Sequence, residues 1–185
     1  MNRNEEQAVV RWSRIDHGDW RLHVAATDTG LCYIGSPDAP FEQLEKWVEA
    51  RVPGSTLVRD DERLTPYVRE LIDYLEGSRT TFEAPLDFKG TAFQTAVWRA
   101  LQGIPYGETR SYSEIAALVD RPAAVRAVGA AIGANPVLVC VPCHRVVGKS
   151  GALTGYRGGL PMKTRLLALE RGQAAEPAPV SPERA

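Results

Sequence analysis

The run Pro142-Cys143-His144-Arg145 places a thiol next to an imidazole and a guanidinium in a chain of 185 residues. A cysteine reacts as the thiolate, and a nearby base, cation or backbone donor lowers its pKa. Because adjacent side chains on an extended chain point apart, we expect His144 to act on Cys143 through a bridging water. The imidazole would need an orienting partner, and Glu170, late in a helix expected over 161–171, is of the right type. These residues predict a nucleophilic cysteine at position 143.

Other interpretations of the same cysteines stay open. Cys140 and Cys143 have the C-x-x-C spacing of a redox pair or of half a zinc site. A zinc site would need two further ligands. The remaining candidates by type are Cys32, His17 and His23. A hydrolase that uses a Cys-His pair would also be compatible with Cys143 and His144.

Length and composition indicate a globular protein. Hydrophobic residues make up 44% of the chain, which is enough for a buried core in one domain or two small ones. No apolar stretch approaches the length of a membrane span, and residues 1–6 are too polar and acidic for a signal peptide. We therefore expect a cytoplasmic monomer without membrane contact. The three cysteines, an odd number, are expected to be free thiols.

Charge divides the chain into two halves of opposite sign. Residues 1–88 contain 10 Lys and Arg against 17 Asp and Glu, a net charge of -7, whereas residues 89–172 contain 11 against 4, a net charge of +7. This split is typical of a protein whose C-terminal half binds an anion. A drift of charge without any function would produce the same counts.

The N-terminal half predicts a small α+β domain. Apolar and polar residues alternate over 9–34 around turn signals, which predicts a meander of antiparallel strands. One helix is predicted over 41–52. A second is predicted over 65–76, with Thr65 as its cap and Pro66 at its first position. Cys32 lies in an apolar run and is expected to be a small core residue.

The second half predicts short helices. Thr91 is expected to cap the first, Ser111 and Glu114 have the spacing of a capping box, and a third helix is predicted over 123–133. We place the boundary in the linker 85–90, which gives domains of 1–90 and 91–172. The tail, 173–185, is rich in Ala, Pro and Glu and is expected to be disordered.

The last two of these helices, separated by Asp120-Arg121-Pro122, predict a helix-turn-helix. The third helix contains almost no bulky side chain and a single long cation, Arg126. Such a helix can approach a nucleic-acid groove closely while the cation reaches toward the bases. The same small residues would equally suit close packing in a core, with Arg126 merely solvated. After this helix, the β-branched run over 137–141 predicts a buried strand that delivers Cys143 at its end.

Several segments together carry a family resemblance. They are Arg126 to Gly129, Asn135-Pro136, Pro142 to Gly148 and Leu153 to Gly159. In this order and spacing they resemble the methylated-DNA protein-cysteine methyltransferases, or O6-alkylguanine-DNA alkyltransferases, closely from about Thr91 to Glu170 and loosely over the N-terminal half. The resemblance implies repair of O6-alkylguanine in double-stranded DNA, with O4-alkylthymine as a second candidate lesion. The alkyl group would pass irreversibly to the protein after nucleotide flipping, once per molecule.

The resemblance also implies roles for individual residues. Cys143 corresponds to the alkyl acceptor, His144 to its water-linked base and Glu170 to the carboxylate that orients the imidazole. Asn135 corresponds to the residue that braces the turn before the acceptor. Tyr112 corresponds to a tyrosine of the pocket, where it would stabilise the departing base. This chemistry requires no metal or organic cofactor.

Further roles concern the substrate and the DNA. The carbonyls of Cys143 and Val146 would accept from the exocyclic amine of guanine, Tyr156 would line the pocket, and the backbone amide near Arg157 would face O6. Some family members carry a serine at the Arg157 position. Arg126 would fill the gap left by the flipped nucleotide. The residues expected to contact DNA are Arg126, Ala127 and Gly129.

The expected fold is therefore of the α+β class. A small N-terminal α/β domain with an antiparallel sheet would precede a helix-rich, winged-helix-like C-terminal domain that contains the helix-turn-helix. Two rival functions remain beside DNA repair. One is a DNA-binding regulator in which Cys143 is buried filler, and the other is a Cys-His hydrolase.

Overall fold

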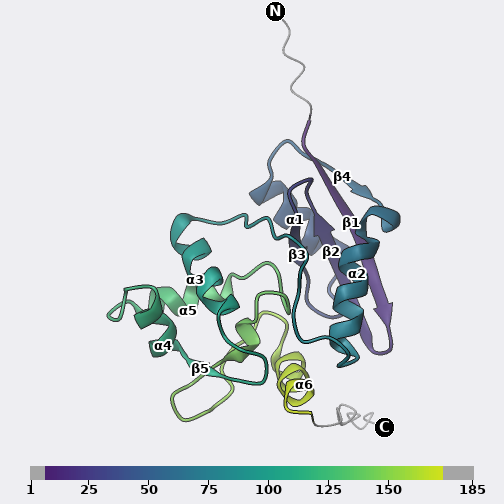
Figure 1. The fold of residues 1–185 in the computed structure, drawn as a ribbon. Helices are drawn as coiled ribbons and strands as arrows, with labels where there is room; N and C mark the ends of the chain where they lie inside the picture. The colour runs from purple at the N-terminus through teal and green to yellow at the C-terminus, as the bar shows by residue number, and fades with distance from the viewer. Residues whose placement is uncertain (1–6, 173–185) are drawn as a thin grey trace, which may run out of the picture.

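The computed structural model describes residues 7–172, so the tail predicted to be disordered lies outside the described residues. Figure 1 shows a sheet-containing half beside a helical half. The strands are β1 (Val9–His17), β2 (Trp20–Ala26), β3 (Leu31–Ile34), β4 (Thr56–Arg59), β5 (Arg110–Ser111) and β6 (Val146–Val147). The helices are α1 (Phe41–Arg51), α2 (Asp61–Leu75), α3 (Ala92–Gln102), α4 (Tyr112–Leu118), α5 (Val125–Gly133) and α6 (Leu160–Glu170), with a 3-10 turn, η1, at Cys143–Arg145.

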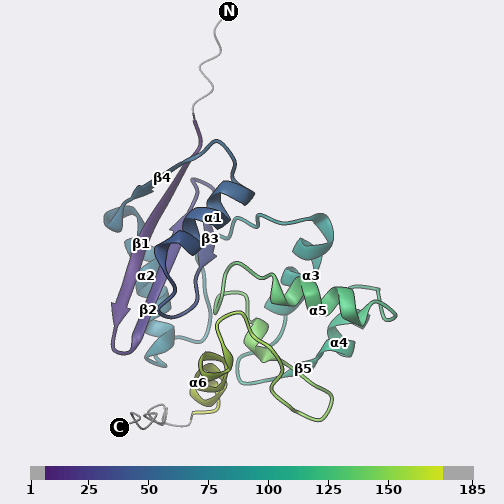
Figure 2. The same ribbon diagram turned by 180° about the vertical axis from the view of Figure 1, so that it is seen from behind.

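The N-terminal sheet has the strand order β3-β2-β1-β4. Its antiparallel meander β1-β2-β3 confirms the prediction, whereas β4, which pairs in parallel with β1, was not predicted. Helices α1 and α2 cover opposite faces of this sheet, as the two views in Figures 1 and 2 show. Cys32 is fully buried on the α1 face beside Leu44 and Val48, so its predicted place in the core is confirmed.

The predicted start of the second helix was wrong. Helix α2 begins at Asp61, four residues before the predicted start, and Asp60 caps it by accepting from the backbone N–H of Arg63 at 3.0 Å. An aspartate cap followed by an acidic first turn favours this earlier start. Pro66 therefore lies inside the helix, and the Thr65 hydroxyl donates to the carbonyl of Asp61 at 2.9 Å.

The helical half follows the predicted caps. Thr91 and Gln94 form a capping box on α3, and Ser111 and Glu114 form one on α4. Helix α5 begins at Val125, two residues later than predicted. Helix α3 packs against α4 and α5, and β5 pairs in parallel with β6, which follows η1 directly. The α+β class with a helix-turn-helix half is confirmed.

The strand predicted over 137–141 is absent. The segment is buried but folds into successive turns, in which the N–H of Cys140 donates to the carbonyl of Leu138 at 2.8 Å. Val139 has a φ of 71°, a left-handed conformation that a strand does not contain. Only Val137 makes a β-bridge, with Ile34. The apolar run reflects burial alone, and Cys143 consequently begins η1 instead of ending a strand.

Candidate active site

Cys143 lies at the start of η1 and is buried. The side-chain amide of Asn135 donates to its Sγ at 3.1 Å and to the carbonyl of Val141 at 3.0 Å. The side-chain oxygen Oδ1 of Asn135 accepts from the N–H of Val137 at 2.9 Å. Asn135 thus binds both ends of the turn 137–141 and contacts the sulfur of Cys143. Burial raises the pKa of the Cys143 thiol, while the Asn135 hydrogen bond and the charges of Arg157 and Lys163 oppose that rise. The resting group at neutral pH is the thiol.

One ring nitrogen of His144, Nε2, is directed at Glu170. Its Nε2 lies 2.7 Å from Oε1 of Glu170, and both side chains are buried. A carboxylate can only accept, so Nε2 carries the proton and Nδ1 keeps a free lone pair. Within residues 7–172, Nδ1 is buried and has no hydrogen-bond partner. Burial lowers the pKa of His144, and Glu170 only partly opposes this. The imidazole is therefore a neutral base at neutral pH.

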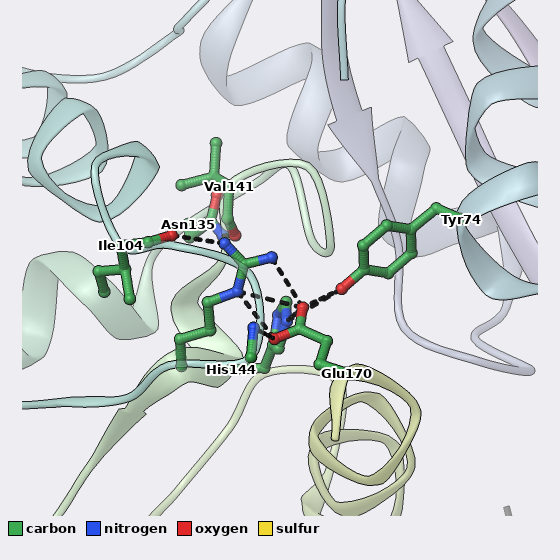
Figure 3. A network of polar contacts seen from close by, with 8 residues as sticks. Tyr74, Ile104, Asn135, Val141, His144 and Glu170 are labelled. Carbon is green, nitrogen blue, oxygen red and sulfur yellow. Dashed lines mark hydrogen bonds and ion pairs between the residues drawn. The ribbon is translucent and has the colours of Figure 1, made fainter. Parts of the chain in front are cut away.

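Glu170 is the centre of a network of buried donors, which Figure 3 shows. Arg145 donates from Nε to Oε2 at 2.9 Å and from Nη2 to Oε1 at 2.8 Å, and the Tyr74 hydroxyl donates to Oε1. Burial alone would raise the pKa of Glu170, but the hydrogen bonds and charges of His144 and Arg145 outweigh it and hold the pKa at about 2. Glu170 remains a carboxylate at every pH at which the enzyme would work.

Three residues of this region were not predicted to belong to a site. Tyr74 comes from α2 in the N-terminal half, where the sequence presents it as one more position on a helix. Arg145 was noted only as a neighbouring cation, yet it also donates to the carbonyl of Ile104 at 2.6 Å. Lys163 is fully buried on α6 and donates to the carbonyls of Val146 at 2.6 Å and Thr154 at 3.2 Å. A charged residue between apolar positions of α6 was the only signal that could have indicated Lys163.

The predicted pocket residues surround the segment that follows Cys143. Tyr112 begins α4 next to the β5–β6 pair, and its hydroxyl lies 2.8 Å from that of Thr154. The Tyr156 hydroxyl is buried without a hydrogen-bond partner in the described part of the chain, and burial raises its pKa, with the charge of a Cys143 thiolate adding to the rise. The Arg157 side chain donates to the carbonyl of Asn135.

Helix α5 presents an exposed small-residue face. Arg126 and Ala127 are exposed and Gly129 is half-buried, whereas Val128, Ala131 and Ile132 are buried. Close packing therefore explains only the buried side of this helix. Helices α4 and α5 lie at the end of the helical half that is remote from the sheet (Figures 1 and 2).

The geometry gives little support to a zinc site or a redox pair at the cysteines. Among residues 7–172, no three His, Cys, Asp or Glu side chains gather closely enough to hold a metal ion. All three cysteines are free, and burial raises the pKa of the Cys140 thiol.

None of the helices described is long and apolar enough to cross a membrane.

Both halves of the chain match models of one family. Residues 92–172 match the DNA-binding domain of 6-O-methylguanine DNA methyltransferase, and residues 10–88 match its ribonuclease-like domain. The chain is 56% identical over 168 residues to a Bacillus subtilis (strain 168) protein named inducible methylated-DNA–protein-cysteine methyltransferase, which covers 91% of this chain and 94% of the relative.

Two solved structures from Mycobacterium tuberculosis are similar in fold. Its O6-methylguanine methyltransferase has a TM-score of 0.76 and 41% identity, over 91% of this chain and 96% of that chain. Its OGT in complex with DNA has a TM-score of 0.76 and 40% identity, over 90% and 94% respectively.

Proposed function

The chain belongs to the 6-O-methylguanine DNA methyltransferase family and is a DNA-repair methyltransferase whose partner is alkylated DNA, and from that premise we propose that Cys143 is its alkyl acceptor. The observation that carries the proposal is the arrangement around one sulfur. Cys143 accepts a hydrogen bond from Asn135, and the next residue is a buried His144 paired with Glu170. Neither Cys32 nor Cys140 has a base beside it in the chain.

The proposed transfer begins with a proton. Because the Cys143 pKa is raised and Nδ1 of His144 has a free lone pair, the thiol proton passes to Nδ1 through a water. Glu170 then faces an imidazolium at 2.7 Å and stabilises its charge. The neutral imidazole and the buried carboxylate are thus the base and its positioning group.

The second step is a displacement at carbon. The sulfur electron pair forms the S–C bond as the C–O6 bond breaks, and the guanine leaves with the bonding pair on O6. The proton that His144 took from the thiol returns through water to the guanine, which leaves the imidazole neutral. Tyr112 is the proposed donor to the departing base, and Tyr156 lines the pocket. The carbonyl of Val146 already accepts from Lys163, but a carbonyl has two lone pairs and can accept from guanine as well. The product is a thioether that water does not hydrolyse, so each molecule acts once.

Access to the lesion requires that the nucleotide leave the base stack, which costs a few kcal/mol. We assign this task to the exposed face of α5. Ala127 and Gly129 let the helix lie against the groove, and Arg126 enters the vacated space. The exposure of Arg126 and Ala127 supports this assignment.

The proposal extends to organisation and location. We retain domains of 1–90 and 91–172, which the family matches over 10–88 and 92–172 support. Because the substrate is DNA, we place the protein in the cytoplasm. We also retain the monomer as its expected state. The transfer balances without a metal or an organic cofactor. The two rival functions, a DNA-binding regulator and a Cys-His hydrolase, have less support because the relatives are named as cysteine methyltransferases.

The test is the intact mass of the protein after exposure to a duplex oligonucleotide that contains O6-methylguanine. We expect a gain of one methyl group, mapped to Cys143, and no gain in Cys143→Ala. Cys140→Ala and Cys32→Ala are the matched controls and should gain as the unchanged protein does. Methyl groups mapped to Cys140 or Cys32 would show that the acceptor is another cysteine, and repeated turnover without a mass change would favour a hydrolase.

A further inference from the structure

The side chain of Arg157 joins three segments that are distant in sequence. Its Nε donates to the carbonyl of Asn135 at 2.8 Å, and its Nη2 donates to the carbonyls of Ile34 at 2.6 Å and Pro136 at 3.1 Å. The guanidinium carbon also lies 5.5 Å from the ring centre of Tyr33. One side chain from the loop before α6 thus binds the end of β3 and the turn that follows α5.

The N-terminal sheet meets this turn through its backbone as well. The N–H of Ile34 donates to the carbonyl of Pro136 at 2.9 Å, and Ile34 and Val137 form a β-bridge. The hydroxyl of Ser36 donates to the carbonyl of Arg157 at 2.9 Å. The last residues of β3 are therefore fastened both to the turn and to the loop that carries Arg157.

On the other side, the turn leads to the reactive sulfur. Arg157 fixes the backbone carbonyl of Asn135, and the side chain of that same residue donates to Sγ of Cys143 at 3.1 Å and to the carbonyl of Val141 at 3.0 Å. A rotation of the Asn135 backbone would carry its amide off the sulfur. The path from β3 to Sγ passes through only two side chains, those of Arg157 and Asn135.

We propose that Arg157 is a positioning residue for alkyl transfer, which holds Asn135 on Cys143 and makes the N-terminal sheet part of the framework of the active site. The inference rests on the proposed function, in which Cys143 is the acceptor. Arginine suits this place because a planar guanidinium offers donors in several directions at once. A lysine, with a single ammonium on a flexible stem, keeps the charge but cannot hold all three carbonyls in one geometry.

The charge of Arg157 adds a second effect that can be measured separately. The other titratable groups that face the Cys143 thiol are Lys163 from α6, Tyr156 from the pocket and the adjacent His144. The Arg157 cation favours the thiolate, so removing the cation raises the thiol pKa. The alkaline rise of the transfer rate, where the thiol ionises without His144, then moves to higher pH, whereas a substitution that only loosens the fold leaves this rise in place.

The test compares single-turnover transfer from an O6-methylguanine duplex across pH in four proteins: unchanged, Arg157→Ala, Arg157→Lys and Arg165→Ala. Arg165 is the matched control because its guanidinium stacks on Trp20 of the sheet at 4.0 Å, so it also joins the two halves but lies on α6, away from the Asn135 turn. Thermal unfolding and duplex affinity are measured for each protein.

We expect Arg157→Ala to lower the limiting rate constant about tenfold to a hundredfold at unchanged duplex affinity, since small misplacements of reacting groups have effects of this size. The alkaline rise of its rate should move to higher pH. Arg157→Lys should lower the limiting rate less and leave this rise in place, because the charge remains. Arg165→Ala should stay within about twofold of the unchanged protein even where it loses stability.

A rate for Arg157→Ala within about twofold of the unchanged protein would overturn the inference. Equal slowing of Arg157→Ala and Arg165→Ala at equal loss of stability would do so too, since Arg157 would then only support the fold. Where Arg157→Ala does not fold, Arg157→Lys decides by the same criterion. If the unchanged protein gains no methyl group on Cys143, the proposed function itself fails, and that result is distinct from every comparison between variants.

Discussion

Cys143 and His144 are adjacent in the chain, yet their reactive atoms have different partners. Sγ accepts from Asn135, whereas Nε2 of His144 faces Glu170. The residue types alone predicted a thiol, a base and an orienting carboxylate. They did not predict that Arg145 and Tyr74 share the same carboxylate, because a contact between α2, η1 and α6 depends on tertiary packing. Glu170 is therefore at once a partner of the base and the counter-ion of a buried guanidinium.

This double role makes a prediction about Glu170→Gln. Transfer should slow, because the imidazolium loses its charge partner, and stability should fall by about 3–5 kcal/mol, because the buried Arg145 loses its counter-ion. Arg145→Met in the same protein should restore part of the stability but none of the rate. The measurements are urea unfolding and single-turnover transfer. Recovery of the rate in the double variant would mean that Glu170 serves only to neutralise Arg145.

The pKa shifts predict how stability depends on pH. The folded pKa of His144 lies below its ordinary value of 6.5, so the unfolded chain binds the proton first and stability falls as the pH drops below about 6.5. The folded pKa of Glu170, about 2, lies below its ordinary value of 4.5. Its contribution is complete above 4.5 and is lost as the pH falls toward 2.

The free energy of unfolding, measured by urea titration from pH 8 to pH 3, should therefore decline in two stages, the first below about pH 6.5 and the second below about pH 4.5. His144→Asn cannot titrate and should lack the first stage while keeping the second. An unchanged first stage in that variant would assign the decline to His23 instead, whose pKa burial also lowers.

At the scale of elements, local sequence signals predicted some helix starts, whereas tertiary packing determined features that the sequence did not reveal. Capping side chains identified the starts of α3 and α4, because a cap depends on residues three apart. The start of α2 was missed because Pro66 was interpreted as a first position, although Asp60 supplies a better cap upstream. The run 137–141 was interpreted as a strand because β-branched residues suit both strands and buried turns. What makes it a turn is the Asn135 side chain, a contact that no periodicity reveals.

Helix α5 carries a prediction of its own. If Arg126 occupies the space of the extruded base, its loss raises the cost of flipping and leaves chemistry in the pocket unchanged. Arg126→Ala should slow transfer from a matched duplex far more than from free O6-methylguanine base. A lesion placed in a mismatched pair should regain part of the rate, because it leaves the stack more easily.

The control is the same substitution assayed on all three substrates by single-turnover kinetics. Equal slowing on the duplex and on the free base would mean that Arg126 supports the pocket or the fold. A loss of duplex affinity that is equal for the matched and the mismatched duplex would identify a phosphate contact instead.

At the scale of the whole molecule, ion pairs involve several cations of the acidic half. Arginines of the acidic half, such as Arg11, Arg14 and Arg21, form ion pairs with aspartates within that half. By contrast, several exposed cations of the helical half take part in no ion pair among the described residues. They are Arg99, Arg121, Arg126 and Lys149. Some cations of the acidic half, such as Lys46, Arg51 and Arg63, also form no ion pair among residues 7–172. The net charge of +7 over residues 89–172, against -7 over residues 1–88, therefore favours the helical half as the side that meets phosphates.

This distribution predicts the salt dependence of DNA binding. Each phosphate contact contributes about -0.9 to the slope of log K against log salt, because binding releases condensed counterions. Arg121 lies in the turn just before α5 and is exposed, so we expect it to contact the backbone that flanks the lesion. Arg121→Ala should reduce the magnitude of the slope by about 0.9 and weaken matched and mismatched duplexes alike. Arg14→Ala removes a cation that is paired with Asp16 on the sheet and should leave the slope unchanged. Equal slopes for Arg121→Ala and the unchanged protein, measured by fluorescence anisotropy over a range of salt, would place the phosphate contacts elsewhere on the helical half.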